Sequence, residues 1–507
     1  MLRKIIIVSV AALFILALSG SCSGNQTANN NAGASADSKT KDPVKLVVYF
    51  LGDSARDDQE VWDVLNKRTS ELINTTFEGK IISWADFGTK FPLLFASGEE
   101  FDATFMAHWS FYADLASQGS LYDLSDDFLS EYGPLLKERM PQTAWNQARV
   151  GGKVYMIPNT QLEFNNMCMV IRGDLRKKYN VPEITSLDIL EQYFDAIAKN
   201  ETGIIPYDGG SDGDDWLNIG LWFLQPYGYL GSVRGYFYKI DDPTMQLIKG
   251  VDIPEYLDFL DKMVDYRERG FWSQSALSQQ NTTIDNFRNG TSAFASHNIP
   301  SMANLMNNVN DENPQWEPEL YDSTFGCAIN GANFLGNGMA INANSKNPER
   351  ALMWLELLRY DRECNDLIEL GIEGRHWIDA GYRLSTPGPE SGSYGAFSWW
   401  GFIDDTVVRK STAMWEGHQA LLDDFFSRLA DNAAMYFLFN GEGFENEGAA
   451  VDSVYYKNYK ALEFGFIPNP RETVMEMDRQ YEAGGRQKIV DEVIKQYTEF
   501  YESYYNK

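Results

Sequence analysis

Residues 329–360 read INGANFLGNGMAINANSKNPERALMWLELLRY, and this stretch decides the fold that we predict for the chain. A short apolar run at 338–341 is followed by polar residues and then by the start of a helix. Asn347 can cap that helix, Pro348 suits its first position, and Glu349 favours its positive end. One face of the helix is predicted to be buried, because apolar residues recur at helical spacing at Ala351, Leu352, Leu355 and Leu358. The pattern alone predicts a strand, a loop and a helix of an α/β domain.

The same stretch carries a family resemblance. Ile-Asn-Ala at 341–343 and Ser-Lys-Asn-Pro-Glu-Arg-Ala at 345–351 resemble a strand and helix of the extracellular solute-binding proteins of bacterial ABC importers, in their carbohydrate-type branch. Further matches to this family are SGEEFD at 97–102, GKVYMIP at 152–158 and NGTSAFASHNI at 289–299. The resemblance implies an α/β fold of two lobes, the type II periplasmic-binding-protein-like fold. In that fold each lobe is a mainly parallel sheet flanked by helices, and the ligand cleft lies between the lobes.

Local patterns support the first of these lobes. Residues 44–51 form a near-continuous apolar run, which is typical of a strand buried on both faces of a parallel sheet. Residues 59–72 show helical periodicity, residues 77–84 resemble a second strand, and a helix through Phe91 and Leu94 leads to a third strand. This β-α-β-α-β order predicts a doubly wound α/β unit.

The resemblance and the composition together suggest a division of the chain. We expect a signal peptide at 1–21, a flexible tether at 22–43, a first lobe at 44–155 plus 328–378, a second lobe at 156–327 plus 379–460, and a C-terminal helical extension at 461–507. The tether is rich in small polar residues and has almost no apolar ones, which favours a flexible chain. The extension resembles the extra C-terminal region of one lipoprotein subgroup of the family.

The amino terminus predicts export. Arg3 and Lys4 precede an apolar run at 5–18, which is short for a membrane span and is followed by small residues and Cys22. This order resembles the bacterial lipobox, in which the Cys is acylated and becomes the first mature residue. Ser19 stands where the lipobox has Leu, and Leu18 lies one step further back. We expect lipid attachment at Cys22 and a protein anchored to the outer face of the cytoplasmic membrane; simple secretion is the alternative.

Composition limits the possible partners. Lys and Arg number 43 and Asp and Glu 72, a formal net charge of −29, which argues against sequence-independent binding to nucleic acid. Beyond Cys22, three cysteines remain without a C-x-x-C pair, and the four histidines show no paired spacing. We therefore predict no transition metal and no cofactor. The resemblance implies an oligosaccharide or other glycan ligand and the permease subunits of an ABC importer as partners, and we expect a monomer.

Aromatic residues are the main candidates for a glycan site. Trp and Tyr rings pair with the apolar C–H faces of a sugar, while carboxylates and amides bond to its hydroxyl groups. Trp399 and Trp400 lie in a Gly-rich stretch, and neighbours on a strand point to opposite faces, so we expect at least one to face the cleft. Trp84 and Trp109 follow predicted parallel strands, whose carboxyl ends usually carry the ligand in α/β sheets. For each ring, burial in a core is the alternative.

Polar residues are the second group of candidates. They are Asp53, just past the first predicted strand, Asn159 at the crossover, and Glu163, Asn298 and Asn333. Such residues more often occupy exposed turns or cap a backbone group, and that structural role is the alternative for each.

Enzyme activity is not predicted. Residues 209–213 fit the G-x-S-x-G pattern of a nucleophile elbow, but 204–207 is too short and Pro-broken to supply the strand that such an elbow needs. Acidic pairs of the kind that a glycosidase uses are too abundant to single one out. The acidic run 208–215 could bind calcium, but Ile219 stands where an EF-hand loop has its final Glu. The remaining alternatives are a secreted carbohydrate-active hydrolase and a glycan-binding surface protein without a transport role.

Overall fold

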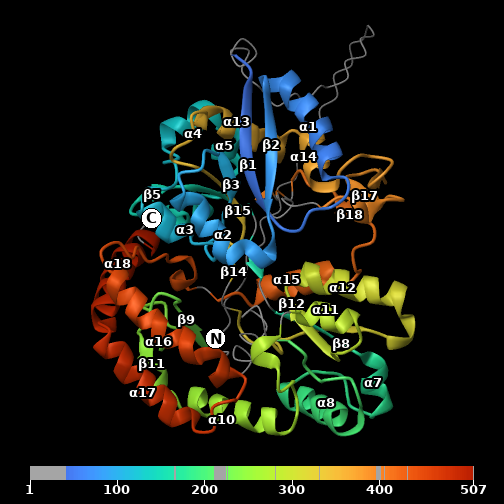
Figure 1. Cartoon of the computed structure of the whole chain (residues 1–507), viewed down its shortest axis with the longest axis vertical. Coiled ribbons are helices and arrows are strands. Elements are labelled where there is room, and N and C mark those ends of the chain that lie inside the picture. The colour runs from blue at the N-terminus through green and yellow to red at the C-terminus, as the bar shows by residue number, and fades with distance from the viewer. Residues whose placement is uncertain are drawn as a thin grey trace, which may run out of the picture.

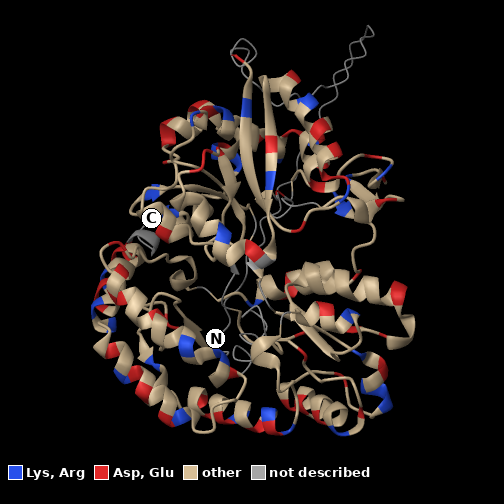
Figure 2. Cartoon of the chain, in the orientation of Figure 1, with Lys and Arg blue, Asp and Glu red and all other residues tan. Residues whose placement is uncertain are grey.

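The structure is a computed structural model that describes residues 42–160, 162–164, 167–209, 224, 226–279, 281–329, 332–395, 401, 402, 404, 406–430 and 432–505. Two lobes make up this part of the chain, one above the other in Figure 1. Acidic and basic residues are interspersed along the ribbon of both lobes (Figure 2). Within the described ranges, no helix combines the length and the apolar character that crossing a membrane requires.

The first lobe is built on a five-stranded sheet. In spatial order its strands are β2 (Thr75–Ile82), β1 (Val44–Leu51), β3 (Ala103–Phe105), β15 (Gly338–Ile341) and β6 (Met156–Pro158). β1 pairs in parallel with β2 and β3, while β15 is antiparallel to both of its neighbours. The predicted strands and the β-α-β-α-β order are confirmed. The carboxyl ends of β1 and β2 point toward the second lobe (Figure 1).

Helices cover this sheet. They are α1 (Asp58–Ile73), α2 (Trp84–Ala96), α3 (Tyr112–Ser117), α4 (Asp126–Tyr132), α5 (Pro134–Arg139), α6 (Gln142–Gln147), α13 (Pro348–Tyr360) and α14 (Arg362–Leu370), and a hairpin of β4 (Arg149–Val150) and β5 (Lys153–Val154) lies beside them. α13 buries the face that its periodicity predicts, and Trp354 on it is fully buried. Pro348 is at its first turn as expected, but Asn347 makes no capping bond with its side chain. That amide instead lies 3.4 Å from Asp102 Oδ1.

The second lobe has a different sheet from the one expected. Its strands, in the order β12 (Phe294–His297), β8 (Cys168–Ile171) and β13 (Glu319–Asp322), are antiparallel, not mainly parallel. β8 enters from the first lobe and runs away from it, whereas β12 and β13 both return, so each pairs with β8 in the opposite direction. The helices of this part are α7 (Gly173–Lys178), α8 (Leu187–Asn200), α10 (Pro254–Glu268), α11 (Thr283–Arg288) and α12 (Ile299–Glu312).

The C-terminal helices belong to the body of the second lobe. They are α15 (His418–Ser427), α16 (Glu445–Glu463), α17 (Pro470–Ala483) and α18 (Arg486–Tyr505), and a small sheet of β9 (Tyr227–Tyr229), β10 (Tyr236–Lys239) and β11 (Ile248–Lys249) packs beside them. Met477 of α17 shares a core with Leu260 of α10, and Val493 of α18 shares one with Tyr238 of β10. The segment that was predicted as a separate extension is therefore an integral part of the second lobe (Figure 1).

Segments of chain that join the lobes lie side by side at their junction. β7 (Glu163–Phe164) and β14 (Ala332–Asn333) pair antiparallel, and Ile329 exchanges backbone hydrogen bonds with the chain at Arg428 and Ala430. The strands β16 (Trp377–Asp379), β17 (Leu384–Pro387) and β18 (Lys410–Ser411) remain on the first lobe, because Arg409 bonds to Asp366 of α14 at 2.9 Å. These contacts place the return to the second lobe later in the chain than the predicted boundary at 378.

Candidate functional site

Four aromatic side chains form a platform on the edge of the first lobe that faces the second. The aromatic platform consists of Trp84, Phe87, Trp109 and Phe111. The rings of Trp84 and Trp109 are stacked, with centroids 6.2 Å apart and planes inclined by 28°. Phe87 contacts the Trp109 ring edge-on at 5.6 Å and lies 6.0 Å from Phe111. Two tryptophans that the sequence singled out separately are thus brought together.

The end of β2 positions the first half of the platform. Ser83 follows β2 and caps α2, accepting a hydrogen bond from the backbone N–H of Asp86 at 3.2 Å. Trp84 is the first helical residue, and Phe87 lies one turn later on the same face, as residues three apart do. α2 runs along the lower edge of the first lobe, next to the second (Figure 1).

The loop after β3 positions the second half. Trp109 donates a hydrogen bond from Nε1 to the carbonyl of Gly336 at 2.7 Å, and the backbone N–H of His108 donates to Leu335 at 2.8 Å. Phe111 has a φ of 65°, a left-handed conformation that costs energy for a residue with a bulky side chain. The chain after β14 therefore fixes this loop, and the loop holds Phe111 in a conformation that it would not adopt alone.

The platform leaves large aromatic surfaces in contact with solvent. Trp84 is 49% exposed, Trp109 39% and Phe111 37%, while Phe105 lies beneath Trp109 with centroids 5.4 Å apart. Adjacent exposed rings of this size are unusual on a soluble protein and mark a binding surface. Flat faces that are open on one side and supported on the other can stack on the apolar face of a ring-shaped ligand.

The polar candidates are dispersed. Asp53 is exposed after the end of β1. Asn159 is fully buried at the crossover after β6, where its backbone N–H donates to Phe334 at 3.2 Å. Asn298 caps α12, and its Oδ1 accepts a hydrogen bond from the backbone of Ser301 at 2.9 Å. The structural alternative, a capping residue, therefore describes Asn298.

The remaining candidates lie at the junction or outside the described residues. Asn333 is half-buried in β14 and pairs with Glu163 of β7, whose side chain is not among the described ones. Trp399, Trp400 and Cys22 lie outside the described residues, as do residues 210–215 of the possible calcium loop and the motif that resembles a nucleophile elbow. Their roles stay predictions.

A buried arginine ties two junction segments to the first lobe. Arg359 of α13 is 1% exposed and donates hydrogen bonds to the carbonyl of Pro158 at 2.8 Å and to that of Gly401 at 3.0 Å. Burial lowers the pKa of this guanidinium from its ordinary value. Arg359 therefore ties the end of β6 and Gly401 to α13 in the core of the first lobe.

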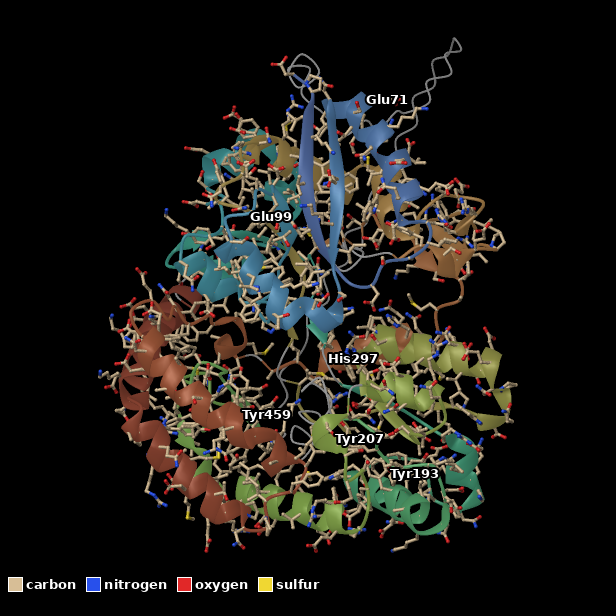
Figure 3. All side chains as sticks on the ribbon, viewed as in Figure 1. Glu71, Glu99, Tyr193, Tyr207, His297 and Tyr459 are labelled. Carbon is tan, nitrogen blue, oxygen red and sulfur yellow. The ribbon has the colours of Figure 1, made fainter. Side chains whose placement is uncertain are left out.

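Some of the site residues were not predicted. Phe87 could have been found from its position three residues after Trp84, and Phe111 from its position two residues after Trp109. Arg359 carries no such signal, because its partners are backbone carbonyls far away in the sequence. His297 ends β12 on the side of the second lobe that faces the first (Figure 3).

No metal-binding cluster accompanies the platform in the part of the chain that the structure describes. Groups of three or more His, Cys, Asp or Glu side chains that could hold an ion are absent from these residues. The site that the described residues build is thus a surface of rings beside a junction between two lobes.

Comparison with known proteins gives this geometry a context. Residues 72–371, more than half of the chain, match the family described as bacterial extracellular solute-binding protein, and residues 433–502 match a domain of unknown function. A carbohydrate ABC transporter substrate-binding protein from Streptococcus pneumoniae serotype 4 is 23% identical over 97% of both chains.

Solved structures share the fold. The N-glycan transport solute-binding protein from Streptococcus pneumoniae in complex with Man1GlcNAc has a TM-score of 0.71 at 18% identity, covering 90% of this chain and 100% of that one. A second binding protein from the same species, in complex with kestose, has a TM-score of 0.63 at 16% identity, with coverage of 91% and 99%. Because the sequence identities are this low, the structural similarity establishes the fold of this chain and nothing more.

Proposed function

The chain belongs to the bacterial extracellular solute-binding proteins, and from that premise we propose that it captures an oligosaccharide between its two lobes and delivers it to an ABC permease. The ligand is held by ring stacking and hydrogen bonding and is released unchanged. The observation that carries the proposal is the aromatic platform, which offers exposed, supported rings at the edge of one lobe where it faces the other.

Sugar chemistry fits such a platform. A pyranose ring presents an apolar C–H face, which packs on Trp84 and Trp109, and a rim of hydroxyl groups, which need polar partners. Asp53 lies beyond the neighbouring strand end and can accept hydrogen bonds from hydroxyl groups. The relatives that were solved with Man1GlcNAc, Man5GlcNAc and kestose make oligosaccharides the first ligands to test.

Delivery requires that the lobes close and open. The paired junction segments and the Arg359 contacts form the region about which such a movement would turn, since hinges are a few residues between rigid bodies. We also propose that the chain is exported, attached to the membrane through a lipid on Cys22, and monomeric. Mass spectrometry of the protein extracted from membranes tests the lipid.

Calorimetric titration with a glycan panel tests the ligand assignment. The panel contains Man1GlcNAc, Man5GlcNAc, kestose and an unrelated peptide pool. We expect wild-type protein to bind at least one oligosaccharide, and Trp84→Ala and Trp109→Ala each to weaken that binding about tenfold or more, as the loss of a central aromatic anchor does.

Tyr382→Ala is the matched control, because Tyr382 is fully exposed on the turn between β16 and β17, away from the platform. Its affinity should equal that of the wild type. Binding of peptides but of no oligosaccharide would overturn the ligand class, and unchanged affinity in both tryptophan variants would remove the platform from the site.

A further inference from the structure

A cavity lies within the second lobe, apart from the aromatic platform. It has a volume of about 110 Å³ and is lined by β9, β10, the start of α10, the end of α16 and the middle of α17. A water molecule needs roughly 10–15 Å³ by this measure, so the cavity has room for a small organic molecule. Much of its wall comes from residues 433–502, which match the domain of unknown function.

Nine of the residues that line the cavity are aromatic. They are Tyr227, Tyr229, Tyr236, Phe237, Tyr256, Phe259, Tyr455, Tyr459 and Tyr481. Tyr455 and Tyr459, one turn apart on α16, are stacked with centroids 4.8 Å apart and planes inclined by 10° (Tyr459 is labelled in Figure 3). Tyr229 is 43% exposed, so the cavity has an aromatic side near solvent.

These rings already bind cations of the protein itself. The guanidinium carbon of Arg234 lies 4.1 Å from the centroid of Tyr455, and that of Arg486 lies 4.7 Å from Tyr236 and 5.1 Å from Tyr481. The negative face of an aromatic ring attracts a positive charge, most strongly where water is excluded. The cavity wall is therefore suited to a positively charged guest.

Charges around the cavity are paired, with one exception. Arg234 bonds to Asp452 at 2.8 Å, Arg486 bonds to Asp478 at 2.5 Å and to Glu482, and Lys249 bonds to Glu482 at 2.7 Å. These three cations thus form ion pairs with the carboxylates of Asp452, Asp478 and Glu482. The fourth carboxylate, that of Glu463, makes no hydrogen bond or ion pair with any residue that the structure describes, and its Oε2 is buried.

A carboxylate with one oxygen buried and unpaired is costly, so Glu463 favours either a proton or a positively charged partner. Burial raises the pKa of Glu463 well above its ordinary value, and the charge of Arg234 offsets this only in part. A cation in the cavity would supply the missing partner, and the tyrosine faces would surround its remaining surface.

We propose that this cavity binds a small organic cation, an amine or a quaternary ammonium compound, with Glu463 as its counter-ion and the tyrosine rings as its cage. The site is independent of the glycan site and would give the C-terminal helices a binding role of their own. Aromatic cages are a general means of recognising quaternary ammonium groups, and Glu463 is the unpaired carboxylate in this one.

Choline and its neutral isostere 3,3-dimethylbutan-1-ol are the probes that test the charge requirement. Titration of the full-length protein at neutral pH should show choline binding, with the isostere at least tenfold weaker. Glu463→Gln removes the charge at constant size and should weaken choline binding at least tenfold. Glu442→Gln, which removes an exposed carboxylate just before α16, is the matched control and should bind as the wild type does.

A second variant keeps the test valid if Glu463→Gln is poorly folded. Val251→Phe adds volume at the cavity wall, keeps the Glu463 carboxylate, and should also abolish choline binding. Equal binding of choline and its isostere, retention of choline binding in both variants, or no choline binding to the wild type at millimolar concentration would overturn the proposal. Loss of glycan binding in Glu463→Gln, with choline never bound, would assign the cavity to the glycan site instead. Glycan titration of the same samples separates this result from a failure of the proposed function.

Discussion

Glu369, on α14 in the first lobe, makes stability depend on pH. Its Oε1 is buried, and within the described ranges its carboxylate has no hydrogen-bonding partner. Burial raises the pKa of Glu369 from 4.5 to about 8, which means that the folded protein holds a proton that the unfolded chain releases. The contribution to stability is fully present below pH 4.5 and is lost as pH rises from there toward 8.

Glu369→Gln should remove the loss of folding stability that the wild type shows as pH rises. We expect the variant and the wild type to have similar melting temperatures at pH 5, and the variant to be more stable at pH 8 by roughly 2–4 kcal/mol, since each pKa unit corresponds to about 1.4 kcal/mol. Thermal unfolding at both pH values measures the difference. Glu373→Gln, at a nearby exposed position, should leave the wild-type pH dependence unchanged. An equal effect of Glu369→Gln at pH 5 and pH 8 would contradict the assignment.

At the residue scale, the sequence located the strand ends that carry the aromatic platform. Trp84 and Trp109 were each selected because a predicted parallel strand precedes them, and both strands are present. That the two rings stack on one another was not predicted. Asn159 was selected because it lies at the first crossover, but the chain after β6 bonds to the segment that contains Phe334, and the residue is buried. Local composition does not tell which of the segments that cross between the lobes lies over which other segment.

At the scale of elements, β15 shows how closely the first-lobe sheet is packed. A Cβ added at Gly338 would lie 2.3 Å from the carbonyl oxygen of Ile157 and 2.8 Å from Met156 Cε. The glycine is therefore required by the close approach of β6, the strand that leads into the first crossover. Gly88 of α2 differs, because an added Cβ there would meet nothing within 4 Å.

Substitution of these two glycines should have opposite effects. Gly338→Ala should destabilise the first lobe by about 1–3 kcal/mol, because the strands must separate to accommodate the methyl group. Gly88→Ala should stabilise it by about 0.5–1 kcal/mol, because a helix interior favours Ala over Gly. Urea unfolding followed by circular dichroism measures both shifts. A stabilising Gly338→Ala would show that β6 and β15 are further apart than described.

Element prediction depended on how far apart the partners are in sequence. β1 was located from its apolar run and α13 from its helical periodicity and start signals, all of which are local patterns. In the second lobe, β8 at 168–171 pairs with β12 at 294–297, and pairing over such a distance leaves no local trace of direction. The expected parallel order failed there, while the helical character of the C-terminal segment was predicted correctly because it follows from local pattern alone.

At the scale of the whole molecule, Asn440 connects the two lobes. Its Oδ1 accepts a hydrogen bond from Ser117 Oγ of α3 at 2.8 Å. Its backbone N–H donates to Gln496 Oε1 of α18 at 2.9 Å, and its carbonyl accepts from Gln496 Nε2 at 3.0 Å. A first-lobe helix and the last helix of the chain thus share one asparagine, and separation of the lobes at this side must break the Ser117 contact.

Ser117→Ala should make the open arrangement of the lobes easier to reach. We expect a larger radius of gyration in ligand-free small-angle scattering, an unchanged value with a bound oligosaccharide, and a loss of glycan affinity of about twofold to fivefold, the size of a single hydrogen bond. Ser130→Ala is the matched control, since Ser130 Oγ also donates to a helix carbonyl but contacts no residue of the second lobe among those described. Identical scattering of Ser117→Ala and wild-type protein without ligand would refute the role of Asn440 as a connection.

The position of α18 has a practical consequence. This helix is part of the second lobe, and its residue Gln496 bonds to Asn440, which in turn bonds to Ser117 of the first lobe. A change in the distance between the lobes therefore alters the surroundings of the end of the chain. Lys495 and Lys153 lie on opposite sides of that contact, and both side chains are more than half exposed. With a donor dye at one of these positions and an acceptor dye at the other, ligand binding would change the efficiency of energy transfer between them. The protein is therefore a starting point for a reagentless optical sensor.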